Sequence, residues 1–203
     1  MPQEILPAQL LGDSHQGGIC MGQDHISRAE LDAALPHVLA APKTDAIVAD
    51  LCLRPALNKR QSMQNLRFSV GDGIAGDRWQ SLPWLRDAAG LPHRGIQVSI
   101  LPLRVFDLVW RDRKATPHPG DPIIADLDTS IANLPIGTLI RAGTGLLRVS
   151  EVPNLGCVKW KVRYGEAALR WVESHPQLRL RGVLCAVEQD GEIRLGDRLQ
   201  VLR

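Results

Sequence analysis

Apolar and polar residues alternate along most of this chain, in short stretches separated by Gly, Asp and Pro. Alternation with a period of two is typical of a half-buried β-strand, and Gly-Asp clusters are typical of the turns between strands. The last two alternating stretches predict hairpins, the second with its turn at Asp190-Gly191. The pattern predicts seven or eight short strands, within the segments 46–55, 63–79, 96–101, 121–130, 137–152 and 181–202.

A helical period appears in three places. Between Ile26 and Pro42 the apolar residues recur on one stripe, and Ser27 with Glu30 forms a capping-box pattern. Because Pro36 lies inside this stretch, we expect two short helices or a kink. The other helices are predicted at 104–110 and 166–174. Three helices are too few for βαβ repetition, so the predicted fold class is mainly β: a mostly antiparallel barrel or sandwich with a few short peripheral helices.

The chain divides into three parts by its texture. Residues 1–24 are rich in Gly, Pro and Gln without a sustained period, so we expect an N-terminal extension. Residues 25–45 form the helical segment, and residues 46–203 form one β-barrel domain. A chain of 203 residues is long enough to build a core without disulfide bonds.

Charge and hydropathy exclude several classes of function. The net charge is +2, and the 24 Lys and Arg residues are interspersed with 22 Asp and Glu residues, so we expect no nucleic-acid partner. No stretch approaches the ~18 apolar residues of a membrane span, so we expect no membrane partner. The N-terminus does not have the pattern of a signal peptide. We therefore expect a cytoplasmic protein with free thiols.

The segment VPNLGCVKWKVRYG, residues 152–165, carries the first candidate for chemistry, Cys157. On an extended chain Lys159 and Lys161 would lie on the same side as this cysteine, and nearby cations favour the reactive thiolate. A helix that begins near Gly165 would add a positive terminus. Taken alone, the segment leaves a reactive sulfur and a buried hydrophobe about equally favoured. Cys52 and Cys185 lie in apolar strands and are predicted to be core residues.

Other candidates carry weaker signals. The turn GDGIAGDRW, residues 71–79, could place backbone N–H groups and Arg78 around an anion, although such turns are usually structural. Asp126 and Asp128 alternate as a metal or acid–base pair would, or else face solvent. A hydrolase dyad of Cys157 with His175 is conceivable but has no local support. Arg179 and Arg181 could bind an anion or stay solvated.

The ordered set of these motifs is more specific than any one of them. Leu-Arg-Pro at a strand end, GDGIAGDRW, IQVSILPLRVFDL, GDPIIADLDTSIANLPIGTLIRAG, VSEVPNLGCVKWKVRYG and the closing LRLRGVLCAVEQDGEIRLGDRLQVL follow one another between residues 46 and 202. In this order they resemble the MOSC domain, the family named for the C-terminal domain of eukaryotic molybdenum-cofactor sulfurases, and most closely its small stand-alone bacterial members. The resemblance implies a MOSC-type β-barrel with a pocket for a molybdenum cofactor (molybdopterin) at one mouth.

The resemblance also implies roles for individual residues. Cys157 falls on the family's reactive cysteine, a molybdenum ligand or a sulfur carrier. Asp77 and Arg78 fall on the family's Gly-Asp-Arg turn. Asn133 falls on the Asn that precedes the Gly-Thr strand of the barrel in that family. The candidates to neutralise a cofactor phosphate are Arg78, Arg94, Lys159, Arg163 and Arg181.

The expected function is therefore sulfur transfer or the molybdenum-dependent reduction of N-hydroxylated compounds, with a separate electron-donor or sulfur-donor protein as partner. The alternative is a non-catalytic module that binds a small anionic ligand or a partner protein at the barrel mouth. Three departures from many relatives matter: Trp79 replaces a His, Gly156 replaces the Pro before the cysteine, and the helix after strand 96–101 lacks a Glu.

Overall fold

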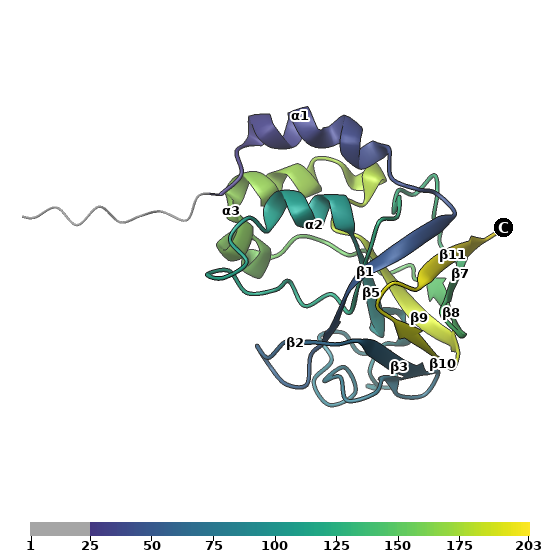
Figure 1. Cartoon of the computed structure of the whole chain (residues 1–203). Helices are drawn as coiled ribbons and strands as arrows, with labels where there is room; N and C mark the ends of the chain where they lie inside the picture. Colours follow the sequence, from purple (N-terminus) through teal and green to yellow (C-terminus); the bar gives the residue numbers. More distant parts are fainter. Residues whose placement is uncertain (1–24) are drawn as a thin grey trace, which may run out of the picture.

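The computed structural model describes residues 25–203, which form a β-barrel with helices gathered on one side (Figure 1). No helix within these residues is long and apolar enough to cross a membrane. The helices are α1 (Arg28–Leu39), α2 (Leu103–Val109) and α3 (Val158–Glu173), with short 3₁₀ turns at Arg94–Ile96 and Pro176–Leu178. The strands are β1 (Asp45–Leu53), β2 (Gln61–Ser62), β3 (Asn65–Ser69), β4 (Gly73–Ile74), β5 (Val98–Pro102), β6 (Ile123–Ala125), β7 (Leu139–Ala142), β8 (Gly145–Val149), β9 (Val183–Gln189), β10 (Gly191–Arg194) and β11 (Arg198–Leu202).

Seven strands close the barrel in the order β1-β11-β7-β8-β9-β5-β6, and β6 returns to β1. Every neighbouring pair is antiparallel except β5 and β6, which are parallel, so the barrel is mixed. Closure removes the exposed strand edges that an open sheet would present. The predicted mainly β fold class is confirmed, with the barrel rather than the sandwich.

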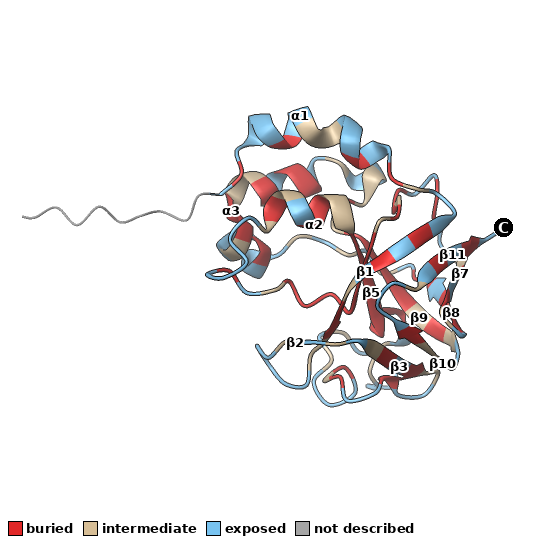
Figure 2. Ribbon diagram, in the orientation of Figure 1, coloured by how far each residue is buried: buried red, intermediate tan, exposed pale blue. Residues whose placement is uncertain are grey.

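The barrel interior is aliphatic, as the scarcity of aromatic residues implies. Alternate residues of the strands point inward and are buried, among them Val48, Ile100, Ile140 and Val187. The strands accordingly carry bands of buried residues (Figure 2). On β5 and β6 both faces are buried, since Ile100 faces the barrel while Leu101 faces the helices. This double burial explains why these segments are nearly continuous apolar runs.

A second, three-stranded sheet has the order β10-β3-β4. The predicted hairpin between residues 181 and 202 is wrong, because β10 pairs with β3 and not with β9. The partners Ile193 and Leu66 are far apart in the chain. The Asp190-Gly191 signal therefore marks the boundary between β9 and β10 but does not indicate the pairing.

The three helices pack on the outward faces of β5 and β6 and form their own apolar cluster, with Phe106, Tyr164 and Trp171 at its centre. The capping box of Ser27 and Glu30 is present, with the hydroxyl and carboxylate bonded to each other's backbone N–H. Pro36 does not divide the segment, and α1 is one helix.

Helix α3 begins earlier than predicted. It starts at Val158 instead of residue 166, and it breaks at Gly165, whose φ of 92° is not helical. A Cβ at this glycine would lie 2.9 Å from His25 Cβ, so the close approach of His25 requires the glycine. The segment expected to be a basic strand is thus the first half of a broken helix, and Cys157 is its N-cap residue.

Candidate functional site

Seven charged residues, six of them cations, line one cavity of about 630 Å³, which we call the cation pocket. Its walls come from the residues after β1, the turn after β4, the loop before β6, the segment 152–157, the first two turns of α3 and the approach to β9. Six cations line it: Arg54, Arg60, Arg78, Lys159, Arg163 and Arg181. Cys157 lines the same cavity.

Only two of the six cations are neutralised by carboxylates within residues 25–203. Arg54 Nε lies 2.8 Å from Asp77, and Arg181 lies 2.9 Å from Asp121 through one terminal nitrogen. The remaining cations form no ion pair with the described carboxylates. A cavity with such an excess of positive charge is suited to an anionic ligand.

Arg60 shows the electrostatic cost of this arrangement. Burial lowers the pKa of its guanidinium, and the charges of Arg163 and Arg78 lower it further. Its Nε is buried without a hydrogen-bond partner. The group lies against Gly120, where an added Cβ would be 3.1 Å from Nε. An anion in the pocket would relieve this repulsion and supply the missing acceptor.

Cys157 is the exposed member of the three cysteines that the structure describes, whereas Cys52 and Cys185 are buried as predicted. As N-cap of α3 it has extended backbone dihedrals, and its carbonyl accepts from the Trp160 N–H at 2.8 Å. Its place in the pocket wall agrees with a pocket-facing thiol and not with one sealed among aliphatic side chains.

The three cations of α3 do not all lie on the side of the cysteine, because the segment is helical. Lys159 and Arg163, four residues apart, both line the cation pocket, and Arg163 donates to the Pro119 carbonyl at 3.2 Å. Lys161 instead pairs with Glu166. The helical spacing selects two of the three predicted cations for the pocket.

Of the other predicted cofactor ligands, Arg78 and Arg181 line the pocket, while three residues do not. Asp77 is buried beneath it and binds Arg54. Arg94 donates to the Val187 carbonyl at 2.8 Å. Asn133 donates to two backbone carbonyls, at 2.9 and 2.8 Å. The side chains of these three residues bind other parts of the protein and lie outside the pocket lining.

Trp79, the main departure from the family pattern, lies behind the pocket and not in it. Its ring is buried with Ile96 and Leu184, next to Val152, and its indole N–H donates to the His93 carbonyl at 3.2 Å. Since Leu184 and Val152 line the cation pocket, Trp79 supports the wall without contributing a polar group to the cavity.

The remaining candidates from the sequence are used elsewhere. Cys157 precedes α3 and His175 follows it, so the helix separates the two members of the conceivable dyad. The His175 imidazole instead contacts the Trp171 carbonyl at 2.8 Å. Asp126 binds Arg104 through both oxygens. Asp128 accepts from the Ser130 N–H as a loop anchor.

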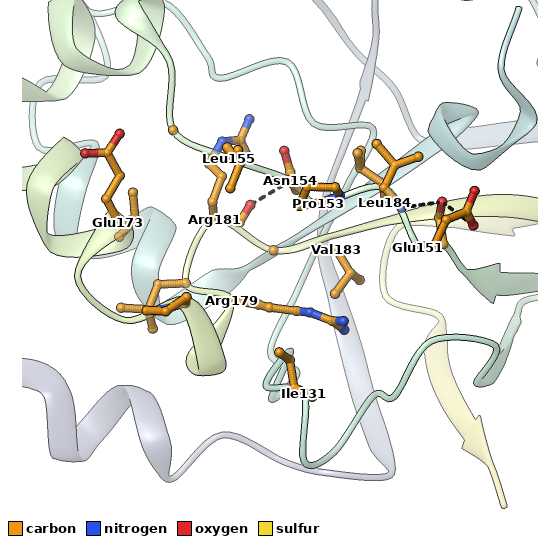
Figure 3. Close-up of a pocket in the computed structure, with 17 residues that line it drawn as sticks. Ile131, Glu151, Pro153, Asn154, Leu155, Glu173, Arg179, Arg181, Val183 and Leu184 are labelled. Carbon is orange, nitrogen blue, oxygen red and sulfur yellow. Dashed lines mark hydrogen bonds between the residues drawn. The ribbon is translucent and has the colours of Figure 1, made fainter. Parts of the chain in front are cut away.

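A smaller cavity of about 270 Å³ shares the segment 152–156 and Arg181 with the cation pocket. Figure 3 shows Asn154 bonded to the backbone of Arg181, a 3.0 Å contact that ties this segment to the approach of β9. Arg179 lines the smaller cavity but donates to the Leu134 carbonyl. The lining is mostly apolar and contains no thiol, so the cation pocket is the better candidate.

Sequence reasoning missed three charged residues of the pocket: Arg54, Arg60 and Asp121. The first and last lie in quoted motifs, at a strand end before Pro55 and in the Gly-Asp-Pro before β6. A charged residue at the end of a barrel strand is a usable signal, because strand ends meet at the barrel mouth. Arg60 lies in an ordinary polar loop and gave no such signal.

The described residues form a closed, mixed seven-stranded barrel with three short helices, and this architecture is consistent with a MOSC-type barrel. Among solved structures, the YuaD protein from Bacillus subtilis is similar, with a TM-score of 0.58 and 19% identity over 79% of this chain and 97% of that one. YiiM from Escherichia coli and YiiM from Geobacillus stearothermophilus, which like YuaD are MOSC-type proteins, each give a TM-score of 0.50 at 14% identity. They match 77% and 78% of this chain and 69% and 75% of their own chains.

No protein-family model matches the sequence, and no curated protein does. At such identities the structural likeness shows the fold alone.

Proposed function

We propose that the protein binds the phosphate-bearing molybdenum cofactor in the cation pocket, with Cys157 as the protein's ligand to molybdenum. The observation that carries the proposal is the convergence of this thiol with six cations on one cavity. A cavity of about 630 Å³ lies in the range that accepts a cofactor-sized ligand.

The donor set fits a metal that arrives with ligands of its own. Within residues 25–203 no group of three or more His, Cys, Asp or Glu side chains could hold a bare metal ion. A molybdenum ion chelated by the cofactor's dithiolene sulfurs needs few protein ligands, and a soft thiolate suits it. The guanidiniums of Arg60 and Arg163, which form no ion pair with a described carboxylate, are suited to the cofactor's phosphate.

The protein residues would have distinct tasks. The cations would hold the anionic end of the cofactor. Cys157, the N-cap residue of α3, would hold its molybdenum end at the pocket wall. When bound, molybdenum supplies two-electron redox chemistry. The net reaction with an N-hydroxylated substrate is R–NHOH + 2e⁻ + 2H⁺ → R–NH₂ + H₂O, and a separate donor protein provides the two electrons.

Sulfur transfer uses the same residue differently. The Cys157 thiolate would attack the outer sulfur of a donor protein's persulfide, forming a persulfide on Cys157 while the donor's cysteine leaves as a thiolate. The exposed position of Cys157 is compatible with the approach of such a partner.

The decisive experiment measures molybdenum in protein that is co-expressed with the cofactor pathway, by plasma mass spectrometry. Wild-type protein is expected to hold close to one molybdenum per chain, and Cys157→Ser less than about a tenth of that, because the hydroxyl is a poor ligand for this soft site. Cys52→Ala, a buried thiol outside the pocket lining, is the matched control and should keep its metal. Equal metal in wild type and Cys157→Ser would contradict the metal-ligand role.

A non-catalytic anion-binding module is the second candidate, because the excess of cations by itself suits any phosphate-bearing ligand. The same preparation distinguishes the two. A phosphate compound recovered without molybdenum would favour the binding module, and a sulfane sulfur on Cys157 detected by intact-mass analysis would favour the sulfur carrier.

A further inference from the structure

One acidic residue, Asp121, lies among the six cations of the pocket. It is 2% exposed, and one carboxylate oxygen accepts from Arg181 at 2.9 Å. The other oxygen, Oδ2, is buried and receives no hydrogen bond of normal geometry, although the Ser99 hydroxyl interacts with the carboxylate. A buried acceptor without a donor is costly, so a bound ligand is a natural source of the missing hydrogen bond.

Asp121 stays ionised in this setting. Burial works to raise its pKa, but the charge and hydrogen bond of Arg181 and the hydroxyl of Ser99 outweigh burial and hold the pKa below its usual range. Arg181 is itself fixed, because its guanidinium carbon lies 4.6 Å from the centre of the Trp160 ring. The pocket thus presents a carboxylate acceptor held by Arg181 as well as a set of guanidinium donors.

These two kinds of group select for a ligand with two different ends. A phosphate suits the cations but is repelled by Asp121, whose free oxygen needs an N–H donor. Asp121 lines the cavity, and because the terminal torsion of an Asp side chain is soft, a small rotation would bring Oδ2 within reach of a ligand there. We propose, on the basis of the proposed function, that the Asp121 carboxylate accepts hydrogen bonds from the 2-amino-pyrimidinone edge of the ligand. Pterins and guanine share this N–H-bearing edge.

The test uses two nucleotides that differ by one group. GMP carries a phosphate and the 2-amino-pyrimidinone edge, and IMP lacks only the 2-amino group. Calorimetric titration of the full-length protein is expected to give GMP an affinity at least about tenfold higher than IMP, the factor that a hydrogen bond to a charged group supplies. Asp121→Asn keeps the shape of the side chain but removes its charge, and should reduce this preference to about threefold or less.

The comparison of GMP with IMP on wild-type protein needs no variant, so it decides the matter even if Asp121→Asn fails to fold. Equal affinities, or binding of inorganic phosphate without either nucleotide, would overturn the role of Asp121 and leave the phosphate site of the proposed function intact. Failure of phosphate itself to bind would contradict the proposed function instead. Neopterin monophosphate separates the two sources of the edge: tighter binding than GMP supports a pterin, whereas weaker binding supports a nucleotide ligand at the same acceptor.

Discussion

Asp77 closes the Gly-rich turn as a carboxylate that has no hydrogen-bonding capacity left for a ligand. Its oxygens accept from the backbone N–H and guanidinium of Arg54, at 2.8 to 3.2 Å, and from the Trp79 N–H at 2.8 Å. The turn therefore positions Arg54 and Arg78 at the pocket mouth while Asp77 stays beneath it. At the scale of single residues, the Gly-Asp-Arg turn contributes its arginine to the pocket lining and uses its aspartate to anchor Arg54.

Asp77→Asn should accordingly lower stability. Removing one charge of a buried pair leaves the Arg54 guanidinium uncompensated, which costs about 3 kcal/mol in the free energy of unfolding. Urea denaturation measures the loss. Asp107→Asn breaks an exposed pair with Arg113 and should cost under about 1 kcal/mol. Similar small costs in both variants would mean that the Asp77 pair contributes little.

Arg60 allows the opposite prediction, because its charge is a burden without a ligand. Arg60→Gln should leave the thermal midpoint of the ligand-free protein unchanged or raised, since it removes repulsion from Arg163. Affinity for inorganic phosphate should fall about tenfold, as one charge-assisted hydrogen bond is lost. Arg94→Gln, outside the pocket lining, is the control and should bind phosphate as wild type does. Unchanged affinity in Arg60→Gln would remove this arginine from the site.

Among the elements, α3 shows most clearly what the sequence could and could not predict. Val158, Trp160, Val162 and Tyr164 alternate strictly with cations, which is the pattern of a strand. In the helix Trp160 and Tyr164 are instead neighbours, one turn apart, and both are buried among the helices while the two valines are exposed. Packing against α1 and α2 decided the conformation, and that information lies outside the segment.

Gly165 divides α3 and aims its first half, with Cys157 at the start, at the pocket. Gly165→Ala should cost about 1–3 kcal/mol, because alanine at φ 92° is strained and its Cβ would meet His25. Gly71→Ala is the matched control: nothing lies within 4 Å of an added Cβ there, and we expect a cost below about 0.5 kcal/mol. Denaturant unfolding compares the two. An equal, small effect would mean that the break is not required.

Across the whole molecule, sequence reasoning succeeded where structure is local and failed where distant segments meet. The strand segments and the placement of Cys157 in a pocket were accessible from alternation and motif order. The union of Arg60, Asp121 and Arg163 in one cavity depends on barrel closure and on the docking of α3, which no local pattern encodes. The pairing of β10 with β3 could not be predicted for the same reason, because it joins segments that are far apart in the chain.

Burial of ionisable groups in the two cores makes the fold sensitive to alkali. Burial raises the pKa of Cys185 to about 12, despite the opposing charge of Arg179, and burial also raises the pKa of Tyr164. Groups with a raised folded-state pKa contribute stability that is fully present below their unfolded values, 9.0 and 10.0, and is lost as the pH rises above them. The free energy of unfolding should therefore fall from about pH 9 upward, by up to about 1.4 kcal/mol per pH unit for each group.

Cys185→Ala isolates one of these contributions. The truncation lowers stability at every pH, but the decline between pH 9 and 11 should become about a third as steep, because Cys185 has the lower unfolded-state value and only Tyr164 then has to lose its proton on unfolding. Val187→Ala, on the same buried strand, creates a similar void without removing an ionisable group, and its decline should match that of wild type. Urea denaturation at half-unit pH steps gives both slopes. If Cys185→Ala declined as steeply as Val187→Ala, the thiol would ionise equally in the folded and unfolded chain, and the alkaline sensitivity would have to arise outside the barrel core.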